Sequence, residues 1–142
     1  MIKLNVKHLE EIRCIGEATY PHECCGVMVG MVEGDVKILT ELFPAENRRT
    51  DSLQNRYLIT SDFLLEVEKR LKITGGKVIG FFHSHPDVPA HPSSYDLEHA
   101  WPWYSYLIVS VRQGKAAEVY NWELRSDRLS FQQEELRISP NC

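Results

Sequence analysis

Short apolar runs bounded by turn residues constrain the fold of this chain more than any other feature of its sequence. Each run has the length and the apolar content of a buried strand. The runs span residues 26–32, 36–43, 77–85, 104–112 and 116–124. Gly34-Asp35 separates the first two runs and Gln113-Gly114 the last two, so both pairs of runs are expected to form hairpins. A chain with this pattern is expected to fold around a β-sheet.

Helical periodicity appears in three other stretches of the chain. They are residues 7–20, a stretch that ends near Ile73 and a short stretch that ends near Ala100. Pro21 stops the first helix, because proline lacks the backbone N–H that a helix interior needs. Ser61 or Asp62 is expected to cap the second helix, and Ser93 or Ser94 the third. Strands that alternate unevenly with helices predict an α/β or α+β fold, a mixed sheet with flanking helices.

Three segments are less regular. Residues 44–55 are polar and predict an exposed loop, whereas residues 57–60 predict a short strand. Residues 128–138 fit either a strand or a helix. No repeat, low-complexity segment or long linker divides the sequence, so residues 1–142 are expected to form a single domain with its own hydrophobic core.

Composition and charge exclude several classes of protein. Hydrophobic residues make up 43% of the chain and charged residues 25%, which is ordinary for a globular domain. The formal net charge of −4 gives no electrostatic reason to expect nucleic-acid binding. No signal peptide is visible, and no apolar run approaches the roughly 18 residues of a membrane span. We therefore expect a cytoplasmic protein that binds neither nucleic acid nor membrane.

The four cysteines predict neither a disulfide framework nor a zinc ribbon. Cys24 and Cys25 are adjacent, Cys14 and Cys142 are distant, and no C-x-x-C pair occurs. The thiols are expected to be reduced. Cys25 has the character of a small core residue rather than a nucleophile.

The segment with the most chemical information is His83-Ser84-His85, at the end of the apolar run 77–85. Residues two apart in a strand point to the same face, so both imidazoles can bind one ion, while Ser84 points away from it. Asp96, on the helix that follows, can supply a third ligand. Two histidines and one carboxylate leave the fourth tetrahedral position open for water, which is the arrangement of a catalytic zinc site.

Each part of this pattern also has an ordinary interpretation. An H-x-H pair occurs by chance, and two imidazoles can simply be hydrogen-bonded polar groups at a strand end. Ser93 can be only a helix cap, and Asp96 can serve only to complement the helix dipole. The combination of strand end, turn, capped helix and carboxylate favours the metal site.

The spacing of these residues resembles a known family motif. His83-x-His85, seven intervening residues and then Ser93-x-x-Asp96 resemble the JAMM motif of the MPN-domain (Mov34/MPN/PAD-1, JAB1-like) metalloproteases. The segment around Glu23, just after the first helix, resembles the upstream glutamate segment of that family. The resemblance covers nearly the whole chain in element order. It implies an MPN/JAB1-type fold, a mixed β-sheet flanked by helices with a cytidine-deaminase-like architecture.

The resemblance also implies a reaction. The chain would be a zinc metallopeptidase with one Zn²⁺ per chain, held by His83, His85 and Asp96 together with a catalytic water. Glu23 would act as the general base that takes a proton from this water and passes it to the leaving amine. Ser93 would hydrogen-bond the developing oxyanion. Capping is the rival role of this serine, and Ser94 can take either part. Trp101 and Trp103 are expected either in the core or at the rim of the cleft.

The shortness of the chain, with no room for a large insertion, resembles the compact stand-alone members of the family in bacteria and archaea. That resemblance implies a deubiquitinase-like isopeptidase, which hydrolyses the amide bond after the C-terminal Gly-Gly of a small ubiquitin-like or sulfur-carrier protein. Three alternatives stay open: a phage-tail-type protein, a DNA-repair-associated protein with another substrate, and a non-enzymatic MPN scaffold. Base deamination would call for a P-C-x-x-C pair, which the chain lacks.

Overall fold

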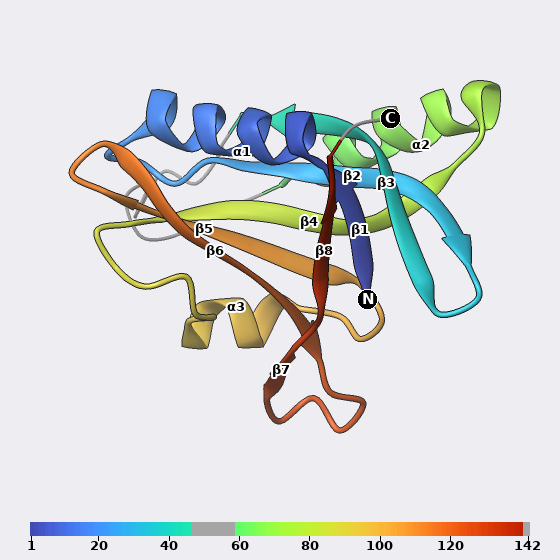
Figure 1. Ribbon diagram of the computed structural model, residues 1–142. Coiled ribbons are helices and arrows are strands. Elements are labelled where there is room, and N and C mark those ends of the chain that lie inside the picture. Colours follow the sequence, from blue (N-terminus) through green and yellow to red (C-terminus); the bar gives the residue numbers. More distant parts are fainter. Residues whose placement is uncertain (47–58, 141–142) are drawn as a thin grey trace.

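The computed structural model describes residues 1–46 and 59–140 (Figure 1). Within these residues the strands are β1 (Ile2–Asn5), β2 (Cys25–Glu33), β3 (Val36–Ala45), β4 (Lys77–Pro86), β5 (Ser105–Arg112), β6 (Lys115–Leu124), β7 (Phe131–Gln133) and β8 (Leu136–Ser139). The helices are α1 (Val6–Thr19), α2 (Ser61–Thr74) and α3 (Ser94–His99). All eight strands form one sheet in the order β7-β6-β5-β4-β2-β3-β1-β8.

The sheet is mixed, as the sequence predicts. β2 pairs antiparallel with both β3 and β4, and β5 pairs antiparallel with β6. β4 and β5 are parallel, and α3 lies in the connection between them. Both predicted hairpins are confirmed. In the second one Gln113 and Gly114 have φ values of 51° and 84°, and positive φ at both central residues is what a type I′ hairpin turn requires.

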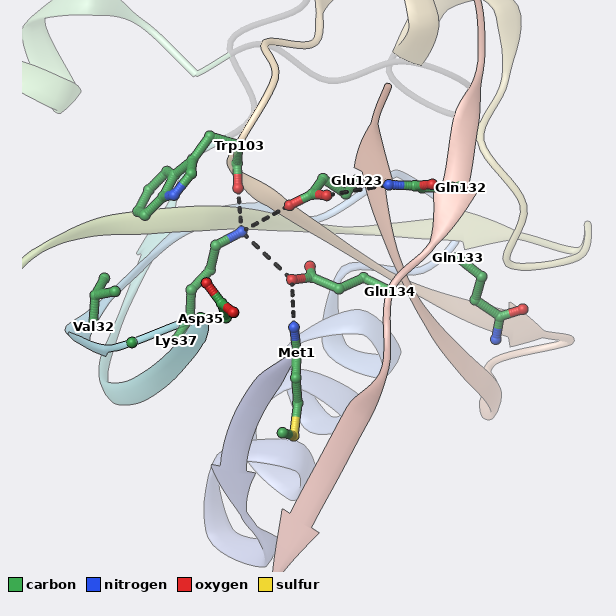
Figure 2. Close-up of a pocket in the computed structure, with 10 residues that line it drawn as sticks. Met1, Val32, Asp35, Lys37, Trp103, Glu123, Gln132, Gln133 and Glu134 are labelled. Carbon is green, nitrogen blue, oxygen red and sulfur yellow. Dashed lines mark hydrogen bonds and ion pairs between the residues drawn. The ribbon is translucent and has the colours of Figure 1, made fainter. Parts of the chain in front are cut away.

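The two outer strands of the sheet, β7 and β8, are consecutive in the sequence. Glu134 lies between them, and its carboxylate accepts hydrogen bonds from Ser105 Oγ at 2.6 Å and from Asn121 Nδ2 at 2.9 Å. The Lys37 ammonium lies 3.6 Å from Glu134 and also donates to the Trp103 carbonyl oxygen (Figure 2). These contacts join strands from both halves of the curled sheet.

α1 and α2 pack on opposite faces of the sheet. Met28 of β2 packs in a cluster with Leu9 and Ile12 of α1, whereas Val27, the neighbouring residue of β2, packs with Val67 of α2. This alternation follows from the two-residue period of a strand. α3 packs on the α2 side, where its Leu97 contacts a third apolar cluster. The molecule therefore has a helix–sheet–helix arrangement, and β4 runs through its middle.

The structure corrects several predictions at the ends of the elements. Thr60, not Ser61 or Asp62, caps α2, because its side chain accepts the Phe63 N–H at 3.2 Å. The predicted strand at 57–60 is wrong for residues 59 and 60, which are not in a strand, and the other two lie outside the described residues.

In other segments the structure decides between two predicted alternatives or shows an element that was not predicted. Residues 128–138 contain β7 and the start of β8, so the helical alternative is wrong. β1, with Ile2 and Leu4 fully buried or nearly so, was not predicted. The predicted loop at 44–55 begins inside β3, and from residue 47 onward it lies outside the described residues. None of the helices in the described ranges combines the length and apolar character needed to cross a bilayer.

Candidate metal centre

Two histidines at the end of β4 point to the same face of the sheet, as predicted. Their Nε2 atoms lie 3.2 Å apart, and the side chains are almost completely buried. Neighbouring strands on both sides hold this part of β4, since His83 is in register with Cys25 of β2 and with Ile108 of β5. The pair therefore sits on a rigid central strand rather than on a loop.

α3 brings a carboxylate to the two imidazoles. Asp96 Oδ1 lies 3.3 Å from His83 Nε2, and Asp96 Oδ2 lies 3.3 Å from His85 Nε2. The helix is held by a capping box: Ser93 Oγ accepts the Asp96 N–H at 3.1 Å, and Asp96 Oδ2 accepts the Ser93 N–H at 2.8 Å. Ser93 rather than Ser94 is thus the cap, and it fixes the carboxylate as well as the helix end.

The donor set of these three residues fits a metal ion. Their ligand atoms all lie within 4.8 Å of one another and all three residues are buried; no other such group occurs among the described residues. Two imidazole nitrogens and one carboxylate oxygen suit zinc, and three protein ligands leave one coordination position for water or substrate.

The hydrogen bond of His85 fixes which of its ring nitrogens faces the ion. His85 Nδ1 lies 3.0 Å from the Pro89 carbonyl oxygen. A carbonyl can only accept, so Nδ1 carries the hydrogen and the lone pair of the neutral ring is on Nε2. Nε2 is the atom that faces His83 and Asp96, so the tautomer is the one a metal requires.

Burial and charge also favour the metal-binding protonation states of His83 and Asp96. Burial lowers the pKa of His83, although the nearby Asp96 acts in the opposite direction. Burial alone would raise the pKa of Asp96, but the two histidines and the Ser93 N–H hold it well below its usual range. A neutral imidazole and an ionised carboxylate are the forms that bind a metal ion.

Glu23 lies between α1 and β2 and is 3% exposed. Burial raises its pKa to about 9, and the negative charge of Asp96 adds to this rise. Cys25, two residues after Glu23, is in register with His83. The Cys24 N–H donates to Ser84 Oγ, between the two histidines. The structure therefore brings the glutamate singled out in the sequence to the neighbourhood of the three candidate ligands.

Ser84 joins the segment that carries Glu23 to the histidine-bearing strand. Ser84 N–H donates to the Cys24 carbonyl at 3.2 Å, and the Cys24 N–H donates to Ser84 Oγ at 2.8 Å. The Ser84 side chain lies on the face of the sheet that α1 covers. The Ser84 Cβ is 3.7 Å from the position that a Cβ on Gly16 of α1 would occupy. Ser84 thus points away from the ligands, as predicted.

The remaining candidate residues also have definite places. Cys25 is fully buried, and burial, with smaller effects of Cys24 and Glu23, raises its pKa to about 12, so it is a core thiol as predicted. Trp101 and Trp103 are 61% and 40% exposed, so the core alternative is wrong for both. Trp101 lines an apolar pocket of about 210 Å³ next to α3, together with Phe81 and Tyr95.

Sequence reasoning missed the groups that support the ligands. The Pro89 carbonyl is a backbone atom, and no residue type signals such an acceptor. The side chains that hold the residues on either side of it, Val88 and Ala90, come from β5 and β6 and are distant in sequence, so only the fold reveals them.

Comparisons with known proteins agree with this geometry. The family profile described as prokaryotic homologs of the JAB domain matches residues 5–125. The chain is 33% identical over 91 residues to desampylase from Haloferax volcanii, which is 63% of this chain and 63% of that protein. It is 28% identical over 112 residues to tail tip assembly protein K of Escherichia phage N15, which is 76% of this chain and 40% of that protein. The chain thus spans less than two thirds of either curated relative.

Solved structures share the fold. A protein from Desulfitobacterium hafniense superposes with a TM-score of 0.86 at 29% identity, over 99% of this chain and 94% of that one. A JAB1/MPN domain protein from Archaeoglobus fulgidus gives a TM-score of 0.59 at 20% identity, over 98% and 97% of the two chains. A structure described as a JAMM metalloprotease-like zinc site in the proteasome and signalosome gives 0.59 at 16% identity, over 98% of both chains.

A mixed sheet of this topology is shared with a JAB1/MPN domain protein, and in this chain it carries a buried His-His-Asp group at the end of a central strand. The predicted MPN/JAB1-type fold is confirmed. The profile match covers most of the sequence, so the chain belongs to the family of prokaryotic homologs of the JAB domain.

Proposed function

We propose that the chain is a zinc-dependent isopeptidase that hydrolyses the amide bond after the C-terminal Gly-Gly of a small ubiquitin-like or sulfur-carrier protein. The buried group of His83, His85 and Asp96, with Glu23 on the segment that is paired with the histidine-bearing strand, is the observation that carries this proposal. The similarity to a desampylase over 91 residues supports a protein substrate. We further propose that residues 1–142 act as one domain, with one zinc ion per chain, in the cytoplasm.

In this proposal His83, His85 and Asp96 hold the zinc ion. Zinc would supply Lewis-acid polarisation of the scissile carbonyl and of the attacking water. Glu23 accepts a proton from that water and delivers it to the leaving nitrogen. Burial prepares this glutamate for both steps, since a carboxyl group with a raised pKa is a stronger base once ionised. A cation held by the neighbouring ligands favours its ionised form.

Ser93 takes two compatible parts in the proposal. Its Oγ accepts the Asp96 N–H as a helix cap, which leaves the hydroxyl hydrogen available. Ser93 is exposed, so this hydrogen can be donated to a substrate. Donation to the oxyanion of the tetrahedral intermediate would contribute about 3 kcal/mol to the stabilisation of the transition state.

The apolar pocket next to α3 is where we place the ubiquitin-like substrate. Tyr95 of α3 lines the pocket, and Asp96, the next residue, reaches the candidate ligands. A second apolar pocket of about 370 Å³ adjoins it and shares Phe81 and Trp101. A protein that covers both pockets with an apolar surface can lay its flexible C-terminal tail beside the metal centre.

The test of this function uses linear fusions in which a ubiquitin-like carrier ending in Gly-Gly precedes a short peptide. Zinc-loaded protein is incubated with the fusion, and intact masses are recorded. We expect a product that ends after Gly-Gly, and no product when Gly-Gly is replaced by Ala-Ala. Equal cleavage of both fusions would refute the substrate assignment. Failure to cleave any fusion or isopeptide conjugate of such carriers, despite bound zinc, would refute the enzymatic function.

A second candidate is a phage-tail-type peptidase that acts on peptides rather than on carrier proteins. The similarity to tail tip assembly protein K over 112 residues supports it. The same mass measurement separates the two, because this peptidase would cleave unrelated peptides as readily as the carrier fusion. A non-enzymatic scaffold is disfavoured, because the candidate ligands are all in place.

A further inference from the structure

The loop that follows β4 is attached to β5 on one side of Pro89. Ser110 Oγ donates a 2.6 Å hydrogen bond to the Val88 carbonyl oxygen, and Ser110 is 0% exposed. One residue earlier, the Asp87 N–H donates to the Val111 carbonyl at 2.7 Å, and an Asp87 carboxylate oxygen accepts the Gln113 N–H at 2.7 Å. The chain before Pro89 is therefore held at both its backbone and its side chains.

The loop is attached to β6 on the other side of Pro89. The Ala90 N–H donates to Glu118 Oε2 at 3.2 Å, and the Trp122 indole N–H donates to the Ala90 carbonyl oxygen at 2.9 Å. Glu118 is itself held by the Arg112 guanidinium at 2.9 Å. Ala90 is 0% exposed, so its two backbone groups depend on these side-chain partners.

The Pro89 carbonyl lies between these attachments and is the hydrogen-bond acceptor of His85 Nδ1. The Pro89 carbonyl belongs to the same planar peptide group as the Ala90 N–H, which Glu118 holds, so the direction of this carbonyl is also fixed. Any side chain that holds the loop thus acts on the orientation and tautomer of His85.

We propose that Ser110, Glu118 and Trp122 are positioning residues of the metal centre, and we call them the loop anchors. They hold the Pro89 carbonyl against His85 Nδ1, so that Nε2 is presented to the ion. This inference rests on the proposed metal site but not on the identity of the substrate. Loss of such an outer hydrogen-bond partner typically weakens metal binding about 10- to 100-fold.

The experiment compares Trp122→Phe, which removes only the indole N–H and part of the ring, with wild type. Zinc affinity is measured by competition with a chromophoric chelator, and cobalt-substituted protein is examined by its visible absorption. We expect zinc to bind about 10-fold more weakly, with a changed cobalt spectrum. Trp103→Phe is the matched control, since the Trp103 ring is partly exposed and lies against the Lys37 and Lys77 ammonium groups, and it should leave both unchanged.

A second readout requires no metal. Nitrogen-15 NMR of the metal-free protein should show His85 as the Nδ1–H tautomer in wild type and a mixture of tautomers in Trp122→Phe. Ser110→Ala should act in the same direction. If both variants keep wild-type zinc affinity and the wild-type tautomer, the loop anchors have no positioning role, while the metal site itself stands. If wild-type protein binds no zinc at all, the proposed function fails and the inference fails with it.

Discussion

At the scale of single residues, sequence spacing identifies His83 and His85 as parts of the site, whereas only a family resemblance indicates Glu23. The two-residue spacing of His83 and His85 predicts a shared face because strand geometry is local. Glu23 is about sixty positions upstream, and the antiparallel pairing of β2 with β4 brings it near. No local pattern encodes that pairing, so spacing alone could not have placed Glu23 at the site.

Replacement of Glu23 by glutamine tests the general-base role directly. Glutamine keeps the shape but cannot accept a proton, so we expect turnover to fall by about 10²–10⁴-fold. Zinc content, measured by mass spectrometry of the metal, should stay at the wild-type level because Glu23 is not among the candidate ligands. Activity close to wild type would remove Glu23 from the mechanism.

Ser84→Ala tests how the segment beside Glu23 is held. The substitution leaves the buried Cys24 N–H without its acceptor, which should lower the free energy of unfolding by about 1–3 kcal/mol in urea denaturation. The displacement of Glu23 should lower kcat while KM and zinc content stay nearly constant. Ser105→Ala is the matched control, because Ser105 is also buried and its hydroxyl donates to Glu134 rather than to the segment beside Glu23. It should lower stability without lowering kcat.

At the scale of elements, strands and helices follow from local periodicity. Where a helix begins depends on which of several adjacent residues makes the capping hydrogen bond. Thr60, Ser61 and Asp62 are all good N-cap residues in succession, so the sequence could not select the one that caps α2. β1, β7 and β8 have three or four residues each, too few for a period to be visible. For α3 the sequence left Ser93 and Ser94 open as the cap, and the structure selects Ser93 because it forms a capping box with Asp96.

The cap of α3 should control metal binding as well as helix stability. Ser93→Ala removes the acceptor of the Asp96 N–H, which should cost about 1 kcal/mol and loosen the Asp96 carboxylate. We expect weaker zinc binding in a chelator competition. Ser94→Ala alters the next residue, which is not the cap, and should bind zinc like wild type. Equal zinc affinity of the two variants would show that the cap does not hold the ligand.

At the scale of the whole molecule, one carboxylate holds the two outer strands of the sheet to its interior. Glu134 contacts groups from β3, β5 and β6, and Figure 2 shows its contact with Lys37 of β3. Burial alone would raise its pKa, but the Ser105 hydroxyl and the Lys37 ammonium lower it below the ordinary value of 4.5. These partners come from three strands, which explains why no sequence pattern pointed to Glu134.

The contacts of Glu134 predict how the free energy of unfolding depends on pH. A carboxylate whose pKa is lower in the folded state stabilises the protein above the unfolded pKa, and this contribution disappears as pH falls through the folded pKa. Glu134→Gln should therefore be destabilised by about 1–3 kcal/mol at pH 7. The difference from wild type should shrink below pH 4.5, the ordinary value for this group. Urea unfolding of both proteins between pH 7 and pH 3 measures it, and a constant difference would contradict the assignment.

The pairing of β1 with β8 also has a consequence for biosynthesis. Of the strands that the structure describes, β1 is synthesised first and β8, its parallel neighbour, is synthesised last (Figure 1). Contacts between segments so distant in sequence form slowly. Until β8 arrives, a nascent chain presents one side of β1 without a partner, and unpaired strand edges promote association between chains. A ribosome stalled before residue 136 would therefore release a product prone to aggregation, even though every candidate zinc ligand had already been synthesised.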